Sequence, residues 1–248
     1  MAVNVFLTSS PFNDCVPEGV DLPCIFDEKN SFVELLRERV KPDARLVVVT
    51  ADPENFDGND EMTQTFENCF LYHGMTLSDV CLCDARTAHM AGEMIRNADI
   101  VMIGGGHVPT QRAFFKQIRM RSLMNKFDGV VIGISAGSMN SARVVYAQPE
   151  MPGESVDPNY KKFFFGLGLS EVKILPHCQK ARHFMLDGRS LYGEITREDS
   201  YGNEFLAIPD GSFVLEEDGH AYLFGEGYRY AEGEMEQICV DGECCELY

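Results

Sequence analysis

Short β-branched runs alternate with segments of helical period along the first half of this chain. Parallel strands joined by helices produce this alternation, because each crossover must return across a face of the sheet. We therefore predict an open, twisted, mostly parallel α/β sheet with helices on both faces. The expected strands are Val3–Leu7, Arg45–Thr50, Thr76–Leu82, Ile100–Ile103 and Gly129–Ile132, and the expected helices are Ser31–Val40, Asp60–His73, Ala85–Asn97 and Pro109–Asn125.

Two of these helices begin with recognisable sequence signals. Ser31 precedes an apolar stripe and has Glu34 three residues later, which predicts a capping box. Pro109 suits the first turn of its helix, where the missing N–H removes no hydrogen bond.

The second half of the sequence is less regular and richer in strands. A helix is expected over Arg182–Tyr192, and turns at Pro209–Gly211 and Glu217–Gly219 predict a closing hairpin or meander, so the C-terminal end should be β-rich. Nothing resembles a linker, and the 248 residues fit a single domain. The acidic, proline-containing stretch 148–160 is expected to be a long functional loop. Further strands are expected at Arg143–Tyr146, Val172–Leu175, Phe205–Ile208, Ser212–Leu215 and Ala221–Phe224.

Charge and cysteine content narrow the classes of partner. The chain has 21 Lys and Arg against 39 Asp and Glu, a formal charge of −18, which disfavours nucleic acid and anionic membranes as partners. Nine cysteines without a secretory leader fit the reducing cytosol, so a cytoplasmic protein is expected. Cys81, Cys83, the Cys244–Cys245 pair and His73 lack the paired spacing of a zinc site, so no metal is expected.

The strongest chemical signal is the G-x-S-x-G pattern at Gly133–Gly137, which lies between an apolar strand and a helix-compatible segment. A serine on such a sharp turn needs small neighbours, and the following helix directs free N–H groups toward the reacting oxygen. Ser135 is therefore the candidate nucleophile, and the Ala136 N–H is a candidate oxyanion donor. A plain glycine-rich turn is the competing interpretation.

A second glycine cluster, Gly104–Gly106, follows the strand Ile100–Ile103 in the same arrangement. Its N–H groups could complete the oxyanion hole, and we assign that role to Gly105, with Gly106 as a substrate contact. A dinucleotide loop would need G-x-G-x-x-G, and Pro109 breaks that pattern. Both glycine turns lie at the carboxyl ends of predicted parallel strands, where open α/β sheets build their sites.

A serine nucleophile needs a base, and His177 is the strongest of six histidines because it follows an apolar strand and Pro176. A purely structural histidine is the alternative. His107, beside the glycine cluster, is the second candidate base and could equally contact substrate, whereas His183 is expected to lie further out.

Together these motifs resemble those of the peptidase E family, serine peptidases that remove amino-terminal aspartate from dipeptides. The resemblance rests on Val101–Gln117, on Gly133–Gly137, on the segment from Gly166-Leu167-Gly168-Leu169 to Pro176-His177, and on Ala207–Gly211. It implies a flavodoxin-like sheet related to class I glutamine amidotransferases, with serine in place of cysteine. No cofactor is implied.

The resemblance also implies a Ser135–His177–acid triad. The family's acid precedes a Met-Pro pair, which here points to Glu150; Asp157, Asp187 and Asp210 are the alternatives. His107-Val108 stands where typical members have Asn-Thr, which makes the aspartyl preference less secure than the hydrolase chemistry.

The expected substrate is a small peptide, and a carboxylate in that substrate would need a cationic partner. Arg182 is the preferred candidate for this role, with Lys180 and Arg189 as alternatives. A related hydrolase acting on a cyanophycin-like polymer or an ester, and a flavodoxin-like binding module without catalysis, remain the competing functions. Whether the chain forms a homodimer is left open by the sequence.

Overall fold

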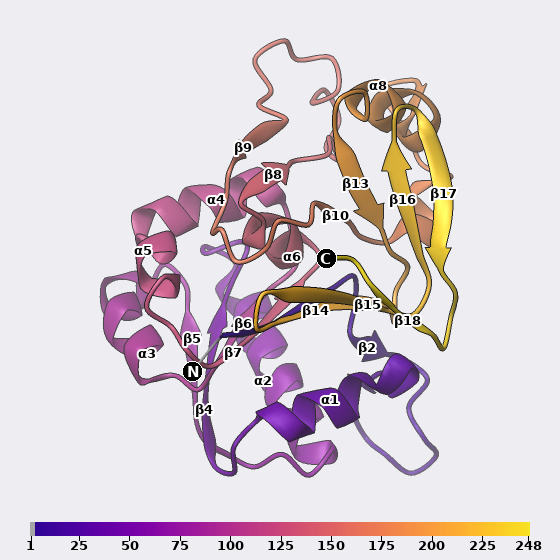
Figure 1. The fold of residues 1–248 in the computed structure, drawn as a ribbon. Coiled ribbons are helices and arrows are strands. Elements are labelled where there is room, and N and C mark those ends of the chain that lie inside the picture. The colour runs from indigo at the N-terminus through magenta and orange to yellow at the C-terminus, as the bar shows by residue number, and fades with distance from the viewer. Residues whose placement is uncertain (1–2) are drawn as a thin grey trace.

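Residues 3–248 are described by a computed structural model. An eight-stranded sheet lies at its centre, in the order β18-β15-β14-β1-β7-β6-β4-β5, and β1, β7, β6, β4 and β5 are mutually parallel (Figure 1). The strands β14, β15 and β18 extend it with antiparallel pairs. The strands of this sheet are β1 (Asn4–Thr8), β4 (Ala44–Val49), β5 (Leu77–Cys83), β6 (Ile100–Ile103), β7 (Val130–Ile134), β14 (Phe213–Glu217), β15 (His220–Phe224) and β18 (Cys244–Glu246).

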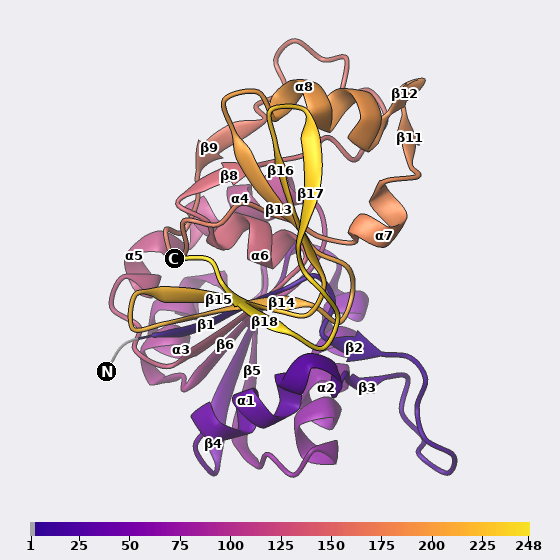
Figure 2. The same ribbon diagram turned by 45° about the vertical axis from the view of Figure 1, so that its right-hand side comes forward.

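Helices cover both faces of the parallel strands, as the alternation predicts (Figures 1 and 2). Alternate strand residues point to opposite faces. Leu46 and Val48 pack with α1 and α2, whereas Val47 and Val49 pack with α3, α4 and α5. The helices are α1 (Phe32–Arg39), α2 (Phe56–Tyr72), α3 (Ala91–Asn97), α4 (Val108–Gln117), α5 (Met120–Met124) and α6 (Ala136–Ser141).

A second sheet, in the order β10-β13-β16-β17, stands above the central one in Figure 2. Its own aromatic core includes Tyr146 stacked on Phe205 with ring centroids 4.4 Å apart. Ile174 and Leu206 of this sheet also pack into the same hydrophobic cluster as Val5 and Val131 of the central sheet. The two sheets therefore meet in one shared hydrophobic cluster, while the second sheet keeps an aromatic core of its own. The strands are β10 (Ile174–Leu175), β13 (Glu204–Ala207), β16 (Gly227–Ala231) and β17 (Glu234–Cys239).

The remaining elements are short. β2 pairs with β3, β8 with β9, and β11 with β12, each antiparallel. Single helical turns lie at Lys29–Ser31 and Ala88–Met90, and Leu191–Thr196 forms a π-helical turn. The other bounds are β2 (Phe12–Asn13), β3 (Ile25–Phe26), β8 (Val144–Tyr146), β9 (Phe163–Phe165), α7 (Cys178–Ala181), β11 (Met185–Leu186), β12 (Arg189–Ser190) and α8 (Arg197–Asp199).

The helix expected over Arg182–Tyr192 is wrong. This segment contains the β11–β12 hairpin, in which Asp187 and Gly188 have φ of 52° and 79°. Two successive positive φ values suit the tight hairpin turn that Asp-Gly favours, and this local preference overrides the helical spacing of the apolar residues.

Two smaller expectations also fail. Ser31 adopts a left-handed φ of 61° and its side chain makes no capping hydrogen bond, so the predicted capping box does not form. The long helix expected over Pro109–Asn125 is two helices, because Arg119, with φ of 55°, separates α4 from α5. Pro109 does lie in the first turn of α4.

Candidate active site

Ser135 lies on a strained turn between β7 and α6. Its backbone has φ 49° and ψ −109°, which a residue other than glycine rarely adopts and which recurs at functional sites. Its N–H donates to the carbonyl oxygens of Thr8 and Ser9, 3.0 and 3.1 Å away, which fixes the turn against the end of β1. The serine is therefore held at the carboxyl edge of the parallel strands, as predicted.

Both glycines of the G-x-S-x-G pattern are required by close packing. A Cβ at Gly133 would lie 2.8 Å from the N of Ser138, and one at Gly137 would lie 2.2 Å from the carbonyl oxygen of Ile103. Both neighbours are backbone atoms that cannot turn aside. The pattern is therefore a sterically determined turn and not an incidental pair of glycines.

His177 contacts the hydroxyl of Ser135. Its Nε2 lies 3.0 Å from Ser135 Oγ, and its Nδ1 lies 2.6 Å from Oδ1 of Asp210. His177 follows β10 and Asp210 follows β13, so the parallel pair β10 and β13 delivers both to the serine. An ionised Asp210 can only accept, which places the proton on Nδ1 and leaves Nε2 free to accept from the hydroxyl.

Asp210 is held by several donors besides His177. Ser9 Oγ donates to its Oδ1 at 2.7 Å, while Gln179 Nε2 and Lys180 Nζ approach its Oδ2 at 2.6 and 3.2 Å. Burial acts to raise the pKa of Asp210, but the hydrogen bonds from His177, Ser9 and Lys180 outweigh burial and hold the pKa well below its usual range. The carboxylate is thus ionised and oriented at neutral pH.

The expectation that Glu150 orients His177 needs correction. Glu150 Oε1 accepts from the N–H of Val108, 3.3 Å away, while Nδ1 of His177 is occupied by Asp210. Asp157 accepts from the N–H of Asn159, and Asp187 accepts from Gly153 and Ser155, so neither takes that place. Asp210 is among the sequence alternatives. Like His177, it follows an apolar strand and a proline, Pro209, and it lies in the Ala207–Gly211 motif, but the resemblance favours the position before the Met-Pro pair.

The second glycine cluster lies beside Ser135. A Cβ built on Gly105 would be 3.4 Å from Cβ of Ser135, and Gly106 has a φ of 148° that favours glycine. Within residues 3–248, the N–H groups of Gly105 and Ala136 have no hydrogen-bond acceptor. Two unpaired amides beside the serine are the arrangement that an oxyanion hole requires.

The comparisons with known proteins agree with this geometry. The model of peptidase family S51 matches residues 33–224. The chain belongs to this family. Membership indicates a serine-type peptidase.

A search of curated proteins found no match to this chain. Among solved structures, it is similar to a crystal structure of a protein assigned to peptidase E from Listeria monocytogenes EGD-e, with a TM-score of 0.58 and 14% identity. The match covers 96% of this chain and 100% of the other. At this identity the likeness concerns the fold, and it supports the predicted α/β class.

A cavity of about 340 Å³ adjoins Ser135 in this S51 peptidase. Ser135 and His177 line it together with Gly106, Glu150 and Lys180. Burial raises the pKa of Glu150, although the hydrogen bond from the Val108 N–H and the nearby His107 act to lower it. One carboxyl and one ammonium therefore face the same small space as the serine.

Arg182 is not among the residues that line this cavity. Its guanidinium lies 5.0 Å from the ring centroid of Tyr228, and its Nε donates to the carbonyl oxygen of Cys178 at 3.1 Å. The expectation that Arg182 contacts substrate is therefore not supported. Lys180, which the sequence offered as an alternative, is the basic residue on the cavity wall, and Arg189 instead pairs with Glu198.

In this S51 peptidase, the ring of His107 is hydrogen-bonded to the 148–160 loop and, within the described residues, not to Ser135. Its Nε2 lies 2.8 Å from Oε1 of Glu154, and its Nδ1 lies 2.7 Å from Oγ1 of Thr110. Glu154 Oε2 also accepts from the N–H groups of Glu150 and Met151. His107 thus holds the segment that carries Glu150 through Glu154. It would influence the substrate through the position of Glu150, and not by the direct contact that was expected.

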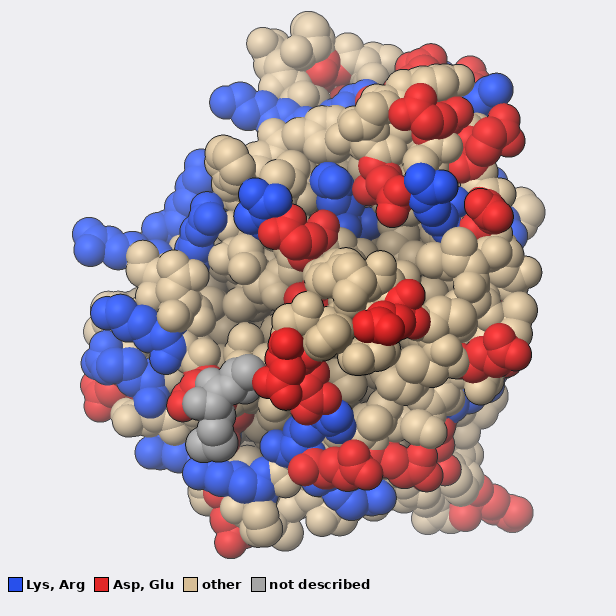
Figure 3. All heavy atoms as spheres, viewed as in Figure 1, with Lys and Arg blue, Asp and Glu red and all other residues tan. Residues whose placement is uncertain are grey.

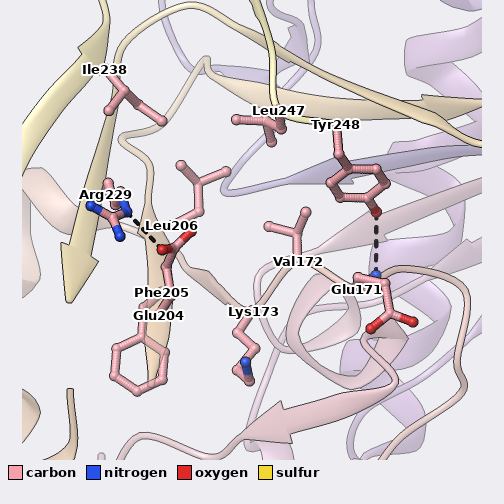
Figure 4. A pocket seen from close by; sticks show the side chains of 10 residues that line it. All are labelled: Glu171, Val172, Lys173, Glu204, Phe205, Leu206, Arg229, Ile238, Leu247 and Tyr248. Carbon is pink, nitrogen blue, oxygen red and sulfur yellow. Dashed lines mark hydrogen bonds and ion pairs between the residues drawn. The ribbon is translucent and has the colours of Figure 1, made fainter. Parts of the chain in front are cut away.

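Another cavity, of about 290 Å³, lies beside β13 and the C-terminal residues (Figure 4). Two of its charged lining residues pair with each other, because Arg229 Nε lies 2.6 Å from Oε2 of Glu204. It contains neither Ser135 nor His177. Over the described part of the chain, no group of three His, Cys, Asp or Glu side chains is arranged to hold a metal ion, and no helix is long and apolar enough to cross a membrane.

Proposed function

We propose that this S51 peptidase hydrolyses short peptides, with a preference for amino-terminal aspartate, through a Ser135–His177–Asp210 triad. The observation that carries the proposal is the continuous hydrogen-bonded chain from Ser135 Oγ to Nε2 of His177 and from Nδ1 to Asp210, at 3.0 and 2.6 Å. This is the geometry of a serine activated by a base whose orientation is fixed by a carboxylate. It also favours an enzyme over a non-catalytic binding module.

In the first half of the reaction, His177 takes the hydroxyl proton as Ser135 Oγ attacks the scissile carbonyl carbon. The N–H groups of Gly105 and Ala136 stabilise the negative charge on the carbonyl oxygen, and Asp210 stabilises the imidazolium. His177 then gives its proton to the leaving amine, which departs as the acyl-enzyme forms. Water, activated by the same imidazole, releases the acid product and restores Ser135.

Two charged side chains on the cavity wall support the aspartyl preference. A dipeptide with amino-terminal aspartate has an ammonium and a β-carboxylate beside its scissile carbonyl. Glu150 and Lys180 line the same cavity as Ser135, so each substrate charge has a protein group of opposite sign available. We assign Lys180 to the β-carboxylate and Glu150 to the ammonium, because an unpaired charge in a small pocket is costly.

A fluorophosphonate probe and a substrate panel test the proposal. The probe should label the wild-type protein on Ser135 and leave Ser135→Ala unlabelled, and that variant should lose about a thousandfold or more in turnover. Retention of more than about a tenth of the activity would show that Ser135 is not the nucleophile.

The panel consists of chromogenic Asp-, Glu-, Ala- and Leu-X substrates. Asp-X should be hydrolysed fastest. Because Lys180 also contacts Asp210, Lys180→Gln should slow every substrate, but the loss of kcat/KM should be at least about tenfold larger for Asp-X than for Ala-X. Arg182→Gln is the matched control and should leave the ratio unchanged. Hydrolysis of esters or of β-linked aspartyl polymers without an Asp-X preference would point to the related hydrolases instead.

A further inference from the structure

An unusually basic segment interrupts this acidic chain. Residues 100–127 contain five Lys or Arg and no Asp or Glu, although the whole chain has a formal charge of −18. The segment includes α4 and α5, and Figure 3 shows Lys and Arg gathered on the left-hand side, where Figure 1 places these two helices. General solubility does not explain a local excess of the minority charge.

Four of these cations surround one cavity of about 340 Å³, which shares no lining residue with the catalytic cavity. Across residues 3–248, none of the four forms a salt bridge or donates a side-chain hydrogen bond to the protein. Unpaired guanidinium groups around a hollow repel one another unless an anion joins them. The four are Arg112, Lys116, Arg119 and Arg121.

Arg112 is the most constrained of these cations. Its guanidinium lies 4.0 Å from the ring centroid of Phe164, and its Nε is buried without a hydrogen-bond partner. The contact with the ring restricts the position of the guanidinium, while the protein leaves its N–H donors without acceptors. Such a pre-oriented fork suits the oxygens of a phosphate group.

The rest of the cavity is apolar and aromatic. Phe115 and Leu167 contribute to its wall, and the ring of Phe165 lies at its edge with 71% of the residue exposed. The adjoining Gly166 is packed so closely that a Cβ would lie 2.4 Å from the carbonyl oxygen of Ala142, so the backbone beside Phe165 is firmly placed. An exposed ring on a fixed segment provides a surface on which a flat ligand can stack.

We propose that this cavity binds a nucleoside phosphate, with the phosphates among Arg112, Arg119 and Arg121 and the base against Phe165. The class follows from combining several cations with an exposed aromatic ring in a space of small-molecule size. An inorganic polyanion would leave the ring unused, and a purely apolar ligand would leave the cations unpaired.

Calorimetric titration with three probes tests the inference: ADP, adenosine and pyrophosphate, without metal. ADP should bind at least about tenfold more tightly than either of the other two, because only ADP uses both features. Failure of ADP to bind at about 5 mM, or binding of pyrophosphate as tight as that of ADP, would overturn the proposal.

Variants of exposed residues locate the site. Arg119→Gln/Arg121→Gln should weaken ADP at least about tenfold, and Phe165→Ala should weaken ADP but leave pyrophosphate unchanged. Lys126→Gln, which removes a charge from the same segment outside the cavity, is the control and should change affinity less than about twofold. Unchanged ADP binding in the double variant would contradict the assignment. So would failure of ADP to bind together with self-association that the double variant abolishes, since the patch would then contact a second copy of the chain.

Discussion

Two carboxyl groups near His177 experience opposite environments. Asp210 receives hydrogen bonds that hold its pKa well below the usual range, whereas the protein around Glu150 raises the pKa of that group. Only Asp210 is hydrogen-bonded to the imidazole. This difference assigns the two residues separate tasks in the proposed reaction, the first as the partner of His177 and the second as a contact for the substrate.

Substitution of each carboxylate by its amide separates these tasks. Asp210→Asn should reduce kcat by about a hundredfold or more, because an amide cannot keep Nδ1 protonated and stabilise the imidazolium. Glu150→Gln should act mainly on KM, with kcat reduced less than about tenfold. Steady-state kinetics with one chromogenic substrate measures both. If Glu150→Gln proves to be the variant with the larger loss of kcat, the triad assigned from the geometry is incorrect.

The same two groups should affect stability with opposite signs. The unfolded chain binds a proton at Asp210 more readily than the folded chain does, so Asp210 stabilises the fold above about pH 4, and this contribution is lost as pH falls. Asp210→Asn should therefore be less stable than wild type at pH 7, with a difference that shrinks below about pH 4.

Glu150 provides the contrasting case in the same experiment. Its raised pKa means that ionisation opposes folding, so Glu150→Gln should be at least as stable as wild type at pH 7, with no gain left below about pH 4. Urea unfolding followed between pH 3 and 7 gives both differences. A stability difference for Asp210→Asn that grows toward low pH would contradict the hydrogen-bonded, ionised state of Asp210.

At the scale of elements, the position of α6 depends on its contact with β6. Gly137 brings the first turn of α6 against the carbonyl oxygen of Ile103, where a Cβ would lie only 2.2 Å away. This contact places Ser135 and Ala136 beside the glycine turn that follows β6. The geometry of the proposed triad therefore depends on a contact between α6 and β6 that none of the triad side chains makes.

Gly137→Ala should consequently displace α6, lowering the free energy of unfolding by about 1–3 kcal/mol or more and reducing kcat at least tenfold. Gly92→Ala in α3 is the matched control. Its Cβ would meet only the ends of the Arg96 and Leu123 side chains, and alanine favours the helix, so stability should stay the same or rise. Chemical denaturation and kinetics on both variants provide the comparison. Full activity in Gly137→Ala would show that α6 can shift without moving the serine.

The elements also show why sequence predicts one part of this fold better than the other. The central strands β6 and β7 are almost wholly apolar and buried, so their positions follow from hydrophobicity, and β6 is predicted to the residue. The edge strand β5 is more polar, with Ser78 and Asp79. The helix expected over Arg182–Tyr192 is instead the β11–β12 hairpin, because the Asp187-Gly188 turn outweighs the helical spacing of the apolar residues, and a π-helical turn begins only at Leu191.

The site divides in the same way. Ser135, His177 and Asp210 each follow an apolar strand and can be found locally as candidates. The choice of Asp210 over Glu150 depends on the pairing of β10 with β13, and the contact from Ser9 depends on the pairing of β1 with β7. Likewise, Lys180 and Arg182 both lie shortly after His177, and sequence alone does not decide which of them faces the cavity. Only the short helix α7 determines that Lys180 faces the cavity and Arg182 packs on Tyr228.

At the scale of the whole molecule, the proposed triad joins two sheets. Ser135 follows β7 of the central sheet, while His177 and Asp210 follow β10 and β13 of the second sheet. Movement of one sheet relative to the other would separate the base from the nucleophile. The shared cluster that contains Val131, Ile174 and Leu206 opposes such movement, because separating the sheets would expose it to water.

We therefore predict that the two sheets unfold together. Cys83 is buried in the hydrophobic cluster between the two sheets, and Cys178 is buried in the aromatic core of the second sheet. Exposure of each thiol therefore reports the unfolding of its own part of the molecule. Pulsed alkylation in increasing urea, read by mass spectrometry, should give the same midpoint for both thiols, because a shared core makes partial unfolding unfavourable. Exposed Cys15 should be labelled at every urea concentration and serves as the control for the pulse. Modification of Cys178 at a clearly lower urea concentration than Cys83 would show that the second sheet opens independently, and peptidase activity should then disappear at that lower midpoint.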